Sequence, residues 1–226
     1  MPRAPEPTAP QNDGLVYHAR SATAAPSTMS KQYDRAYFEK WYRHAKHRVG
    51  TRAELARKVA MIVHLAEYYL ARPLRNVLDV GCGEASWRAP LLRLRPGIAY
   101  RGLDSSAYAV ARYGRTRNIG LASFGQLGEL RFDQRFDLIV CSDVLHYVPA
   151  MELHRGLSGF GDLLEGVAFL ETYTSRDNVS GDYDGFIARA PAWYRKAFIE
   201  AGLLPCGSHT YLGARLMRSI AALECL

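Results

Sequence analysis

The sequence lacks any hydrophobic run long enough to cross a membrane. Its longest apolar stretches, such as FDLIV at 136–140, fall far short of the roughly 20 residues of a transmembrane helix. We therefore expect no transmembrane helix and no membrane partner. The first 28 residues are rich in Pro, Ala, Ser and Thr and have no secretory-type apolar segment. This composition predicts a flexible tail over residues 1–30 rather than a signal peptide.

Cysteine pairs and metal-binding spacings are also missing. The four cysteines, Cys82, Cys141, Cys206 and Cys225, include no CxxC pair, and no histidine stands at metal-ligand spacing from them. We therefore expect no metal site. A cytoplasmic protein with reduced cysteines is the simplest interpretation.

The chain has no long run of one charge, although its formal net charge is +7. The basic residues are spread along the whole length and match no nucleic-acid recognition motif. Dispersed basic residues favour a solvated surface. We therefore do not expect a nucleic-acid partner.

What the chain does contain is an alternation of short apolar strands and amphipathic helices. We expect strands at 76–80, 98–104, 121–124, 136–142 and 166–174 and two more around Gly213, and helices within 34–48, at 51–70, after the glycines up to Arg95, and at 106–113, 149–164 and 191–202. Thr51 and Glu54 indicate a capping box at the start of the second helix.

This alternation predicts an α/β fold. The expected architecture is a Rossmann-like, seven-stranded, mostly parallel sheet with helices on both faces and an antiparallel C-terminal hairpin. Residues 31–226 are expected to form one domain. Within it, residues 31–72 would be an N-terminal helical cap and residues 73–226 the Rossmann-like core.

The stretch VLDVGCGEASWRAP, residues 77–90, carries the strongest functional signal. Gly81 permits a tight turn after the first strand, and Gly83 allows a ligand to approach the backbone. Asp104 ends the second strand, where a carboxylate can accept hydrogen bonds from both hydroxyls of a ribose. Together the turn and the acid indicate a nucleoside site.

Two residues favour S-adenosylmethionine over NAD at this site. A dinucleotide motif would have a third glycine where this chain has Ser86. Asp79, just before the glycines, would repel a pyrophosphate but suits a ligand with an ammonium or sulfonium charge. An NAD-dependent oxidoreductase is therefore the weaker alternative.

Residues 77–212 resemble the class I S-adenosylmethionine-dependent methyltransferases. LDVGCGEAS is similar to the family's first motif, with Ala85 as a mild departure, and GLDSS is similar to the segment with the ribose-binding acid. CSDVLHYV, 141–148, is similar to the segment that passes the methionine and methyl groups. The resemblance implies a methyltransferase domain that binds S-adenosylmethionine through Asp79, Gly81, Gly83, Asp104, Ser105, Gln126, Leu127 and Cys141. Gln126 would accept from the adenine amino group.

His146 is the leading candidate for a catalytic residue, as a general base or as an orienting group. Its ordinary pKa lies near neutrality, and it follows the fourth strand closely. The alternative is that it only packs against the cofactor. Asp143 is a candidate cap of the following turn. Glu171 and Tyr173 are expected on the substrate side, with a structural hydrogen bond as the alternative to a chemical role.

Two further segments are candidates for closing the site. The aromatic stretch 33–43 is a candidate lid, in which Tyr37 would shield the sulfonium and Arg43 would reach the methionine carboxylate. Packing of these aromatic residues on the sheet is the alternative. The polar loop at 175–195 would be on the acceptor side, and it carries four aromatic residues that suit an aromatic or apolar acceptor or else anchor the loop: Tyr183, Phe186, Trp193 and Tyr194.

We therefore expect an enzyme that methylates a small-molecule acceptor. RNA or protein methylation and non-catalytic binding of S-adenosylmethionine are the alternatives. The sequence indicates no oligomeric state.

Overall fold

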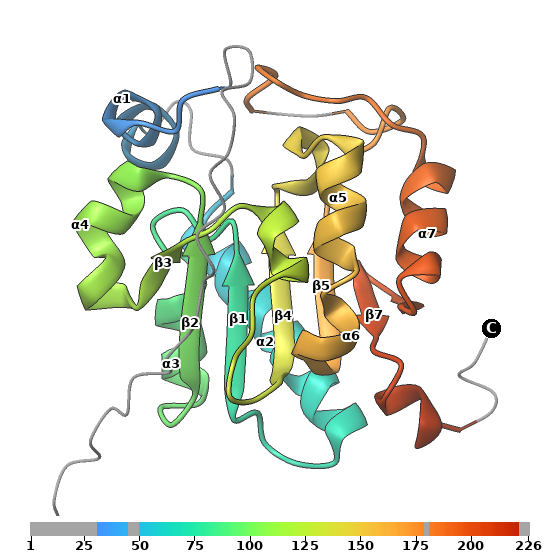
Figure 1. The fold of residues 1–226 in the computed structure, drawn as a ribbon. Helices are drawn as coiled ribbons and strands as arrows, with labels where there is room; N and C mark the ends of the chain where they lie inside the picture. Colours follow the sequence, from blue (N-terminus) through green and yellow to red (C-terminus); the bar gives the residue numbers. More distant parts are fainter. Residues whose placement is uncertain (1–30, 45–49, 179–180, 222–226) are drawn as a thin grey trace, which may run out of the picture.

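The computed structural model describes residues 31–44, 50–178 and 181–221. The tail predicted for residues 1–30, part of the predicted first helix and Cys225 lie outside the described residues. Figure 1 shows a central sheet with helices on both sides and short segments above the carboxyl ends of its strands.

The sheet has seven strands in the order β3-β2-β1-β4-β5-β7-β6, as predicted. The first five strands along the chain run parallel to one another, and β7 runs antiparallel to both β5 and β6. The strands are β1 (Asn76–Val80), β2 (Ala99–Asp104), β3 (Ile119–Leu121), β4 (Phe136–Ser142), β5 (Leu164–Glu171), β6 (Leu204–Gly207) and β7 (Thr210–Leu212). The order reverses between β1 and β4, and an α/β sheet normally binds its ligand at this point.

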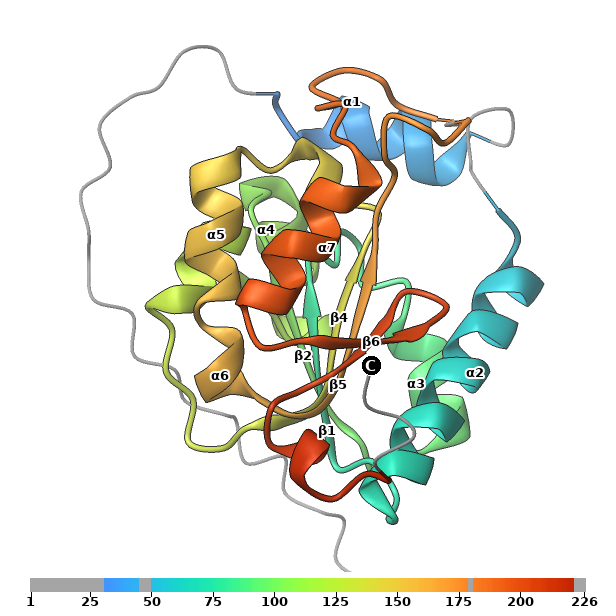
Figure 2. The ribbon, with the colours of Figure 1, turned by 90° about the vertical axis from the view of Figure 1, so that its right-hand side faces the viewer.

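Helices cover both faces of the sheet, and each face has its own apolar core. Figure 2 shows α2 and α3 on one side and α5, α6 and α7 on the other. The helices are α1 (Arg35–Phe38), η1 (Glu39–Arg43), α2 (Arg52–Leu70), α3 (Arg88–Leu94), α4 (Ala107–Arg117), η2 (Phe124–Gly128), η3 (Leu145–Tyr147), α5 (Ala150–Leu157), α6 (Phe160–Leu163), α7 (Pro191–Glu200) and η4 (Leu216–Arg218). The predicted capping box is confirmed, because Thr51 and Glu54 exchange both hydrogen bonds.

Several predicted boundaries were wrong. The helix predicted at 106–113 continues to Arg117. The strand predicted at 121–124 is at 119–121. The helix predicted at 149–164 is two helices. The intervening Gly159 packs directly against the backbone of Leu127, where no side chain fits. The C-terminal hairpin turns at Ser208 and His209, both with positive φ, and not at Gly213.

A buried ion pair joins the amino ends of β1 and β4, away from the site. Arg72 donates to both oxygens of Asp137 at 2.7 Å, and the backbone N–H of Arg75 donates to the same carboxylate at 2.8 Å. The Asp137 side chain is only 5% exposed. Removal of one partner from such a pair leaves a buried charge without compensation.

We predict that Asp137→Ala lowers the free energy of unfolding by about 3 kcal/mol, because it breaks this pair. Urea denaturation measures the change. The matched control is Glu200→Ala, since Glu200 pairs with Lys196 at 3.8 Å on the exposed face of α7. The control is expected to change the free energy by no more than about 0.5 kcal/mol. Equal effects of the two variants would contradict the prediction.

Candidate functional site

The glycine turn after β1 and the end of β2 are joined by one carboxylate. Gly81 and Gly83 have φ angles of 68° and 53°, in the left-handed region. One oxygen of Asp104 accepts from the Gly83 N–H at 2.7 Å and the other from the Ser106 N–H at 2.8 Å. An ionised carboxylate has about four lone-pair positions, so each oxygen can accept a further hydrogen bond. Ser105, predicted at this site, is exposed beside Asp104.

Burial of Asp104 raises the pKa of its carboxyl group, and the two backbone N–H donors oppose this rise. Asp79, below the turn, is also buried, and Tyr100 donates a hydrogen bond to it at 2.7 Å. Burial raises the pKa of Asp79 to about 7. A positive charge nearby would favour the ionised form of both acids. The position therefore suits a cationic ligand.

The predicted lid segment lies over the glycine turn. A Cβ atom added at Gly83 would overlap the hydroxyl of Tyr42 and would lie 3.4 Å from the ring of Phe38. Phe38 is buried, and its ring lies 5.5 Å from that of Tyr37 and 5.0 Å from that of Tyr42. Sequence reasoning selected Tyr37 but missed Tyr42, although both belong to the same aromatic cluster.

Arg43 contacts the glycine turn from its outer side. Its guanidinium donates to Glu84 at 2.5 Å and to the hydroxyl of Tyr113 at 2.9 Å. Glu84 is the residue directly after Gly83. The structure thus brings Arg43 to the predicted motif, but through a carboxylate partner that sequence reasoning did not anticipate.

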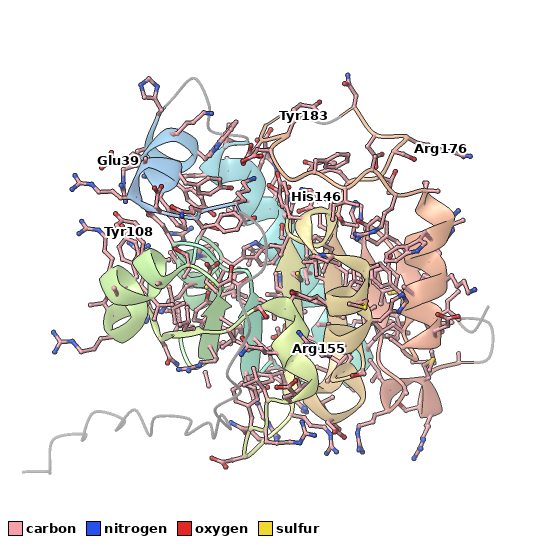
Figure 3. All side chains as sticks on the ribbon, turned by 45° about the horizontal axis from the view of Figure 1, so that its top comes forward. Glu39, Tyr108, His146, Arg155, Arg176 and Tyr183 are labelled. Carbon is pink, nitrogen blue, oxygen red and sulfur yellow. The ribbon has the colours of Figure 1, made fainter. Side chains whose placement is uncertain are left out.

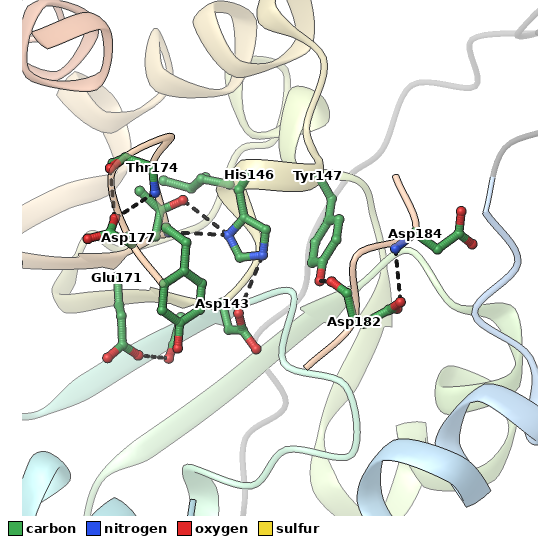
Figure 4. Close-up of polar contacts among 12 residues, drawn as sticks. Asp143, His146, Tyr147, Glu171, Thr174, Asp177, Asp182 and Asp184 are labelled. Carbon is green, nitrogen blue, oxygen red and sulfur yellow. Dashed lines mark hydrogen bonds and ion pairs between the residues drawn. The ribbon is translucent and has the colours of Figure 1, made fainter. Parts of the chain in front are cut away.

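Lys31 connects the lid segment to the loop that precedes α7. Its ammonium forms an ion pair with Asp182, donates to the backbone oxygen of Asp184 at 2.7 Å, and lies 4.0 Å from the ring centroid of Tyr147. Tyr147 in turn donates to the backbone oxygen of Asp182 at 2.6 Å. Figure 4 shows Tyr147 facing Asp182 and Asp184. We call residues 31–43 and 181–190, joined in this way, the two-part lid.

The residues predicted near the adenine and the methionine differ in their exposure to solvent. Gln126 is exposed on η2, and its side-chain oxygen accepts from the Ser123 N–H at 2.8 Å. Leu127 and Cys141 are fully buried in the core. Only their backbone atoms are therefore candidates for contact with a ligand.

His146 is buried, with 1% of its side chain exposed. Its Nδ1 accepts from the Tyr173 N–H at 3.4 Å and lies 3.2 Å from the Thr172 hydroxyl, so we assign the ring proton to Nε2. Nε2 lies 3.4 Å from Asp143 but has no hydrogen-bond partner among the described residues. Burial lowers the pKa of His146 to about 4. The neutral ring in this arrangement presents an N–H donor and no free lone pair.

Asp143 follows β4 with a φ of 63°, and its side chain is 59% accessible to solvent. Partial burial of the carboxyl group raises its pKa to about 6, the negative charge of Glu171 adds to this rise, and the positive charges of Lys58 and Lys31 oppose it. Glu171 itself, predicted on the substrate side, accepts from Lys58 at 2.6 and 2.7 Å and from Ser142 at 2.5 Å. Figure 4 shows Asp143 directly below the ring of His146.

The predicted acceptor-side aromatic residues separate into two groups. Phe186 lies with its ring centroid 5.4 Å from that of His146, and Tyr183 is 59% exposed. Tyr194 is buried in the core, and Trp193 packs on Arg189. In Figure 3, His146 lies beneath the loop that carries Tyr183. Trp193 and Tyr194 therefore anchor the loop that precedes α7.

No helix in the described ranges is both long and apolar enough to cross a membrane. Among the same residues, no three His, Cys, Asp or Glu side chains are grouped to hold a metal ion.

Comparisons with known proteins identify a family. The profile of a family described as a methyltransferase domain matches residues 35–213. The sugar N-methyltransferase KedS8 from Streptoalloteichus sp ATCC 53650 is 18% identical, with a TM-score of 0.58 over 87% of this chain and 99% of that chain. Magnesium protoporphyrin IX methyltransferase (ChlM) from Synechocystis PCC 6803, solved with bound SAM, is 18% identical, with a TM-score of 0.55 over 80% and 93%. At 18% identity, the similarity to these two structures shows a shared fold and nothing further. No curated protein sequence matches this chain.

We predict that His146 stays neutral down to a pH far below its ordinary pKa of about 6.5, since burial disfavours the imidazolium. Its NMR ring resonances should therefore not shift between about pH 8 and 5.5. The unfolded chain takes up a proton in this range and the folded one does not, so the contribution of His146 to stability falls as the pH drops. A titration midpoint near pH 6.5 would contradict the assignment.

Proposed function

The chain belongs to the methyltransferase-domain family, and on this premise we propose that it transfers a methyl group from S-adenosylmethionine to a small-molecule acceptor. The observation that carries the proposal is the glycine turn tied to Asp104 at the point where the strand order reverses. Ligands of open α/β sheets bind at this position. Asp104 has free lone pairs for the two ribose hydroxyls, which fits the adenosine part of the cofactor.

We assign the other cofactor contacts as follows. Asp79 and the aromatic rings of Tyr37 and Tyr42 suit the positive charge of the cofactor, by charge attraction and by cation–π contact. Arg43 would bind the methionine carboxylate only by sharing its guanidinium with Glu84. The remaining proposed contacts are made through the backbone or exposed polar groups of Gly81, Ser105, Gln126, Leu127 and Cys141.

The bound cofactor would supply an electrophilic methyl group on a positively charged sulfur. The chain must then hold an acceptor atom in line with that methyl group, about 3 Å away, and exclude water. The two-part lid fits the second task, because Lys31 joins its halves above the strand ends. A lid of this kind favours small acceptors over RNA or protein.

His146 is proposed as an orienting group and not as a general base. Its Nδ1 lone pair is engaged, and its Nε2–H points at Asp143. Donation from His146 would hold the Asp143 carboxylate in place at the end of β4.

We further propose that residues 31–72 form the cap of one domain whose core is residues 73–226. A cytoplasmic location is part of the same proposal, since Cys82 and Cys141 are buried free thiols, and reduced cysteines are typical of a reducing compartment.

Calorimetry with S-adenosylhomocysteine and NAD tests the proposed function. We expect the former to bind and NAD not to bind. Asp104→Asn should weaken binding of S-adenosylhomocysteine about tenfold or more, because it removes charge-assisted hydrogen bonds. Asp133→Asn is the matched control, since Asp133 is an exposed acid before the amino end of β4. A dissociation constant within about twofold of wild type in folded Asp104→Asn would remove Asp104 from the site.

Loss of the lid contact should show in the kinetics of ligand release. We predict that Lys31→Met raises the dissociation rate of S-adenosylhomocysteine about fivefold, the scale of an ion pair plus a cation–π contact. Stopped-flow fluorescence measures this rate. Lys196→Met, on the exposed face of α7, should leave it unchanged. An unchanged rate in Lys31→Met would show that the two-part lid does not retain the ligand.

A further inference from the structure

Three carboxylates lie together on the acceptor side of the site. They are those of Asp143 after β4, Glu171 at the end of β5 and Asp182 in the two-part lid (Figure 4). Glu171 and Asp182 both act on Asp143 through their negative charges. The whole chain, in contrast, has a formal net charge of +7.

Two of these three carboxylates have a lysine partner and one does not. Lys58 pairs with Glu171, and Lys31 pairs with Asp182. Within the described part of the chain, no lysine or arginine lies within 4 Å of the Asp143 carboxylate. Its one ion-pair partner there, His146, is neutral because burial lowers its pKa. The solvent-exposed carboxylate of Asp143 therefore has no positively charged partner at ion-pair distance in the described ranges, although Lys58 and Lys31 attract it from further away.

The ring of His146 provides an independent indication of a ligand. It is a buried polar side chain whose Nε2–H has no hydrogen-bond partner among the described residues and points at Asp143 from 3.4 Å. Buried N–H groups are rarely left unpaired, so this bond is expected to tighten when Asp143 is drawn into position by a ligand.

The rings around this point also suit a cation. The ring centroids of Tyr173 and Phe186 each lie 5.4 Å from that of His146, and the ring of Tyr147, 4.2 Å from it, already lies against the Lys31 ammonium. Aromatic faces attract ammonium groups and do not attract carboxylates. A neutral acceptor would leave the Asp143 charge unpaired, and an anionic acceptor would be repelled by it.

We propose that the acceptor is an amine, which Asp143 binds through its ammonium group while His146 positions the carboxylate. This inference rests on the proposed function and adds the substrate class to it.

The chemistry balances with groups already named. The bound ammonium gives one proton to the Asp143 carboxylate and becomes a neutral amine. The nitrogen lone pair then forms a bond to the methyl carbon as the carbon–sulfur bond breaks, and the electron pair of that bond stays on sulfur. The methylated nitrogen carries the positive charge away, and Asp143 releases its proton to solvent. The carboxylate thus has two tasks, binding and proton acceptance.

A fragment screen tests this proposal. The full chain is saturated with S-adenosylhomocysteine and screened by ligand-observed NMR against a set in which each amine has an alcohol and a carboxylate of the same skeleton. We expect amines to be enriched among the hits about fivefold or more. Asp143→Asn should abolish the enrichment, and Asp133→Asn should keep it. Amine hits are then incubated with S-adenosylmethionine, and mass spectrometry should find N-methylated products.

The outcomes of the screen distinguish failure of the proposed function from failure of the amine inference. Failure of S-adenosylhomocysteine to bind would overturn the proposed function itself. Normal binding of that ligand without amine enrichment, including a screen with no hits, would overturn only the amine inference. Enrichment that persists in Asp143→Asn, or an Asp143→Asn variant that loses about tenfold in affinity for S-adenosylhomocysteine, would also overturn it. In the last case Asp143 would serve the cofactor's ammonium group.

Discussion

A single carboxylate organises the end of the sheet where the candidate site lies. Asp104 accepts backbone hydrogen bonds from Gly83 and Ser106, and so joins the turn after β1 to the start of α4. Because Gly83 has a left-handed φ and no side chain, the turn folds closely against this acid. The lid segment rests on the same structure, since the Ser106 hydroxyl donates to the backbone oxygen of Tyr33. Turn, helix start and lid are thereby fixed relative to one another.

Most of the fold and the core of the site could be predicted from the sequence because their signals are local. The strands, the capping box at Thr51 and the glycine turn follow from residue types within a few positions. The predicted sheet with its C-terminal hairpin is confirmed. Asp104 could also be selected, because it ends the strand that follows the glycine turn, 21 positions beyond Gly83. The family match agrees with the interpretation as a methyltransferase.

The remainder depends on contacts between distant segments. Lys31 meets Asp184 across 153 positions of the chain, and no local pattern indicates that partner. The same holds for Arg43 and Glu84, 41 positions apart. The helix division before β5 was missed for a similar reason, since the packing of Gly159 on Leu127 decides it. His146 was selected from the sequence as a candidate, but its proton assignment required its buried neighbours.

These features lead to one central claim, that the glycine turn and Asp104 hold the adenosine of S-adenosylmethionine. A crystal structure with S-adenosylhomocysteine is the most direct test. Our account predicts that both ribose hydroxyls lie within hydrogen-bonding distance of the Asp104 carboxylate, with the sulfur below the two-part lid. A ligand bound elsewhere, or ribose hydroxyls without contact to Asp104, would contradict it.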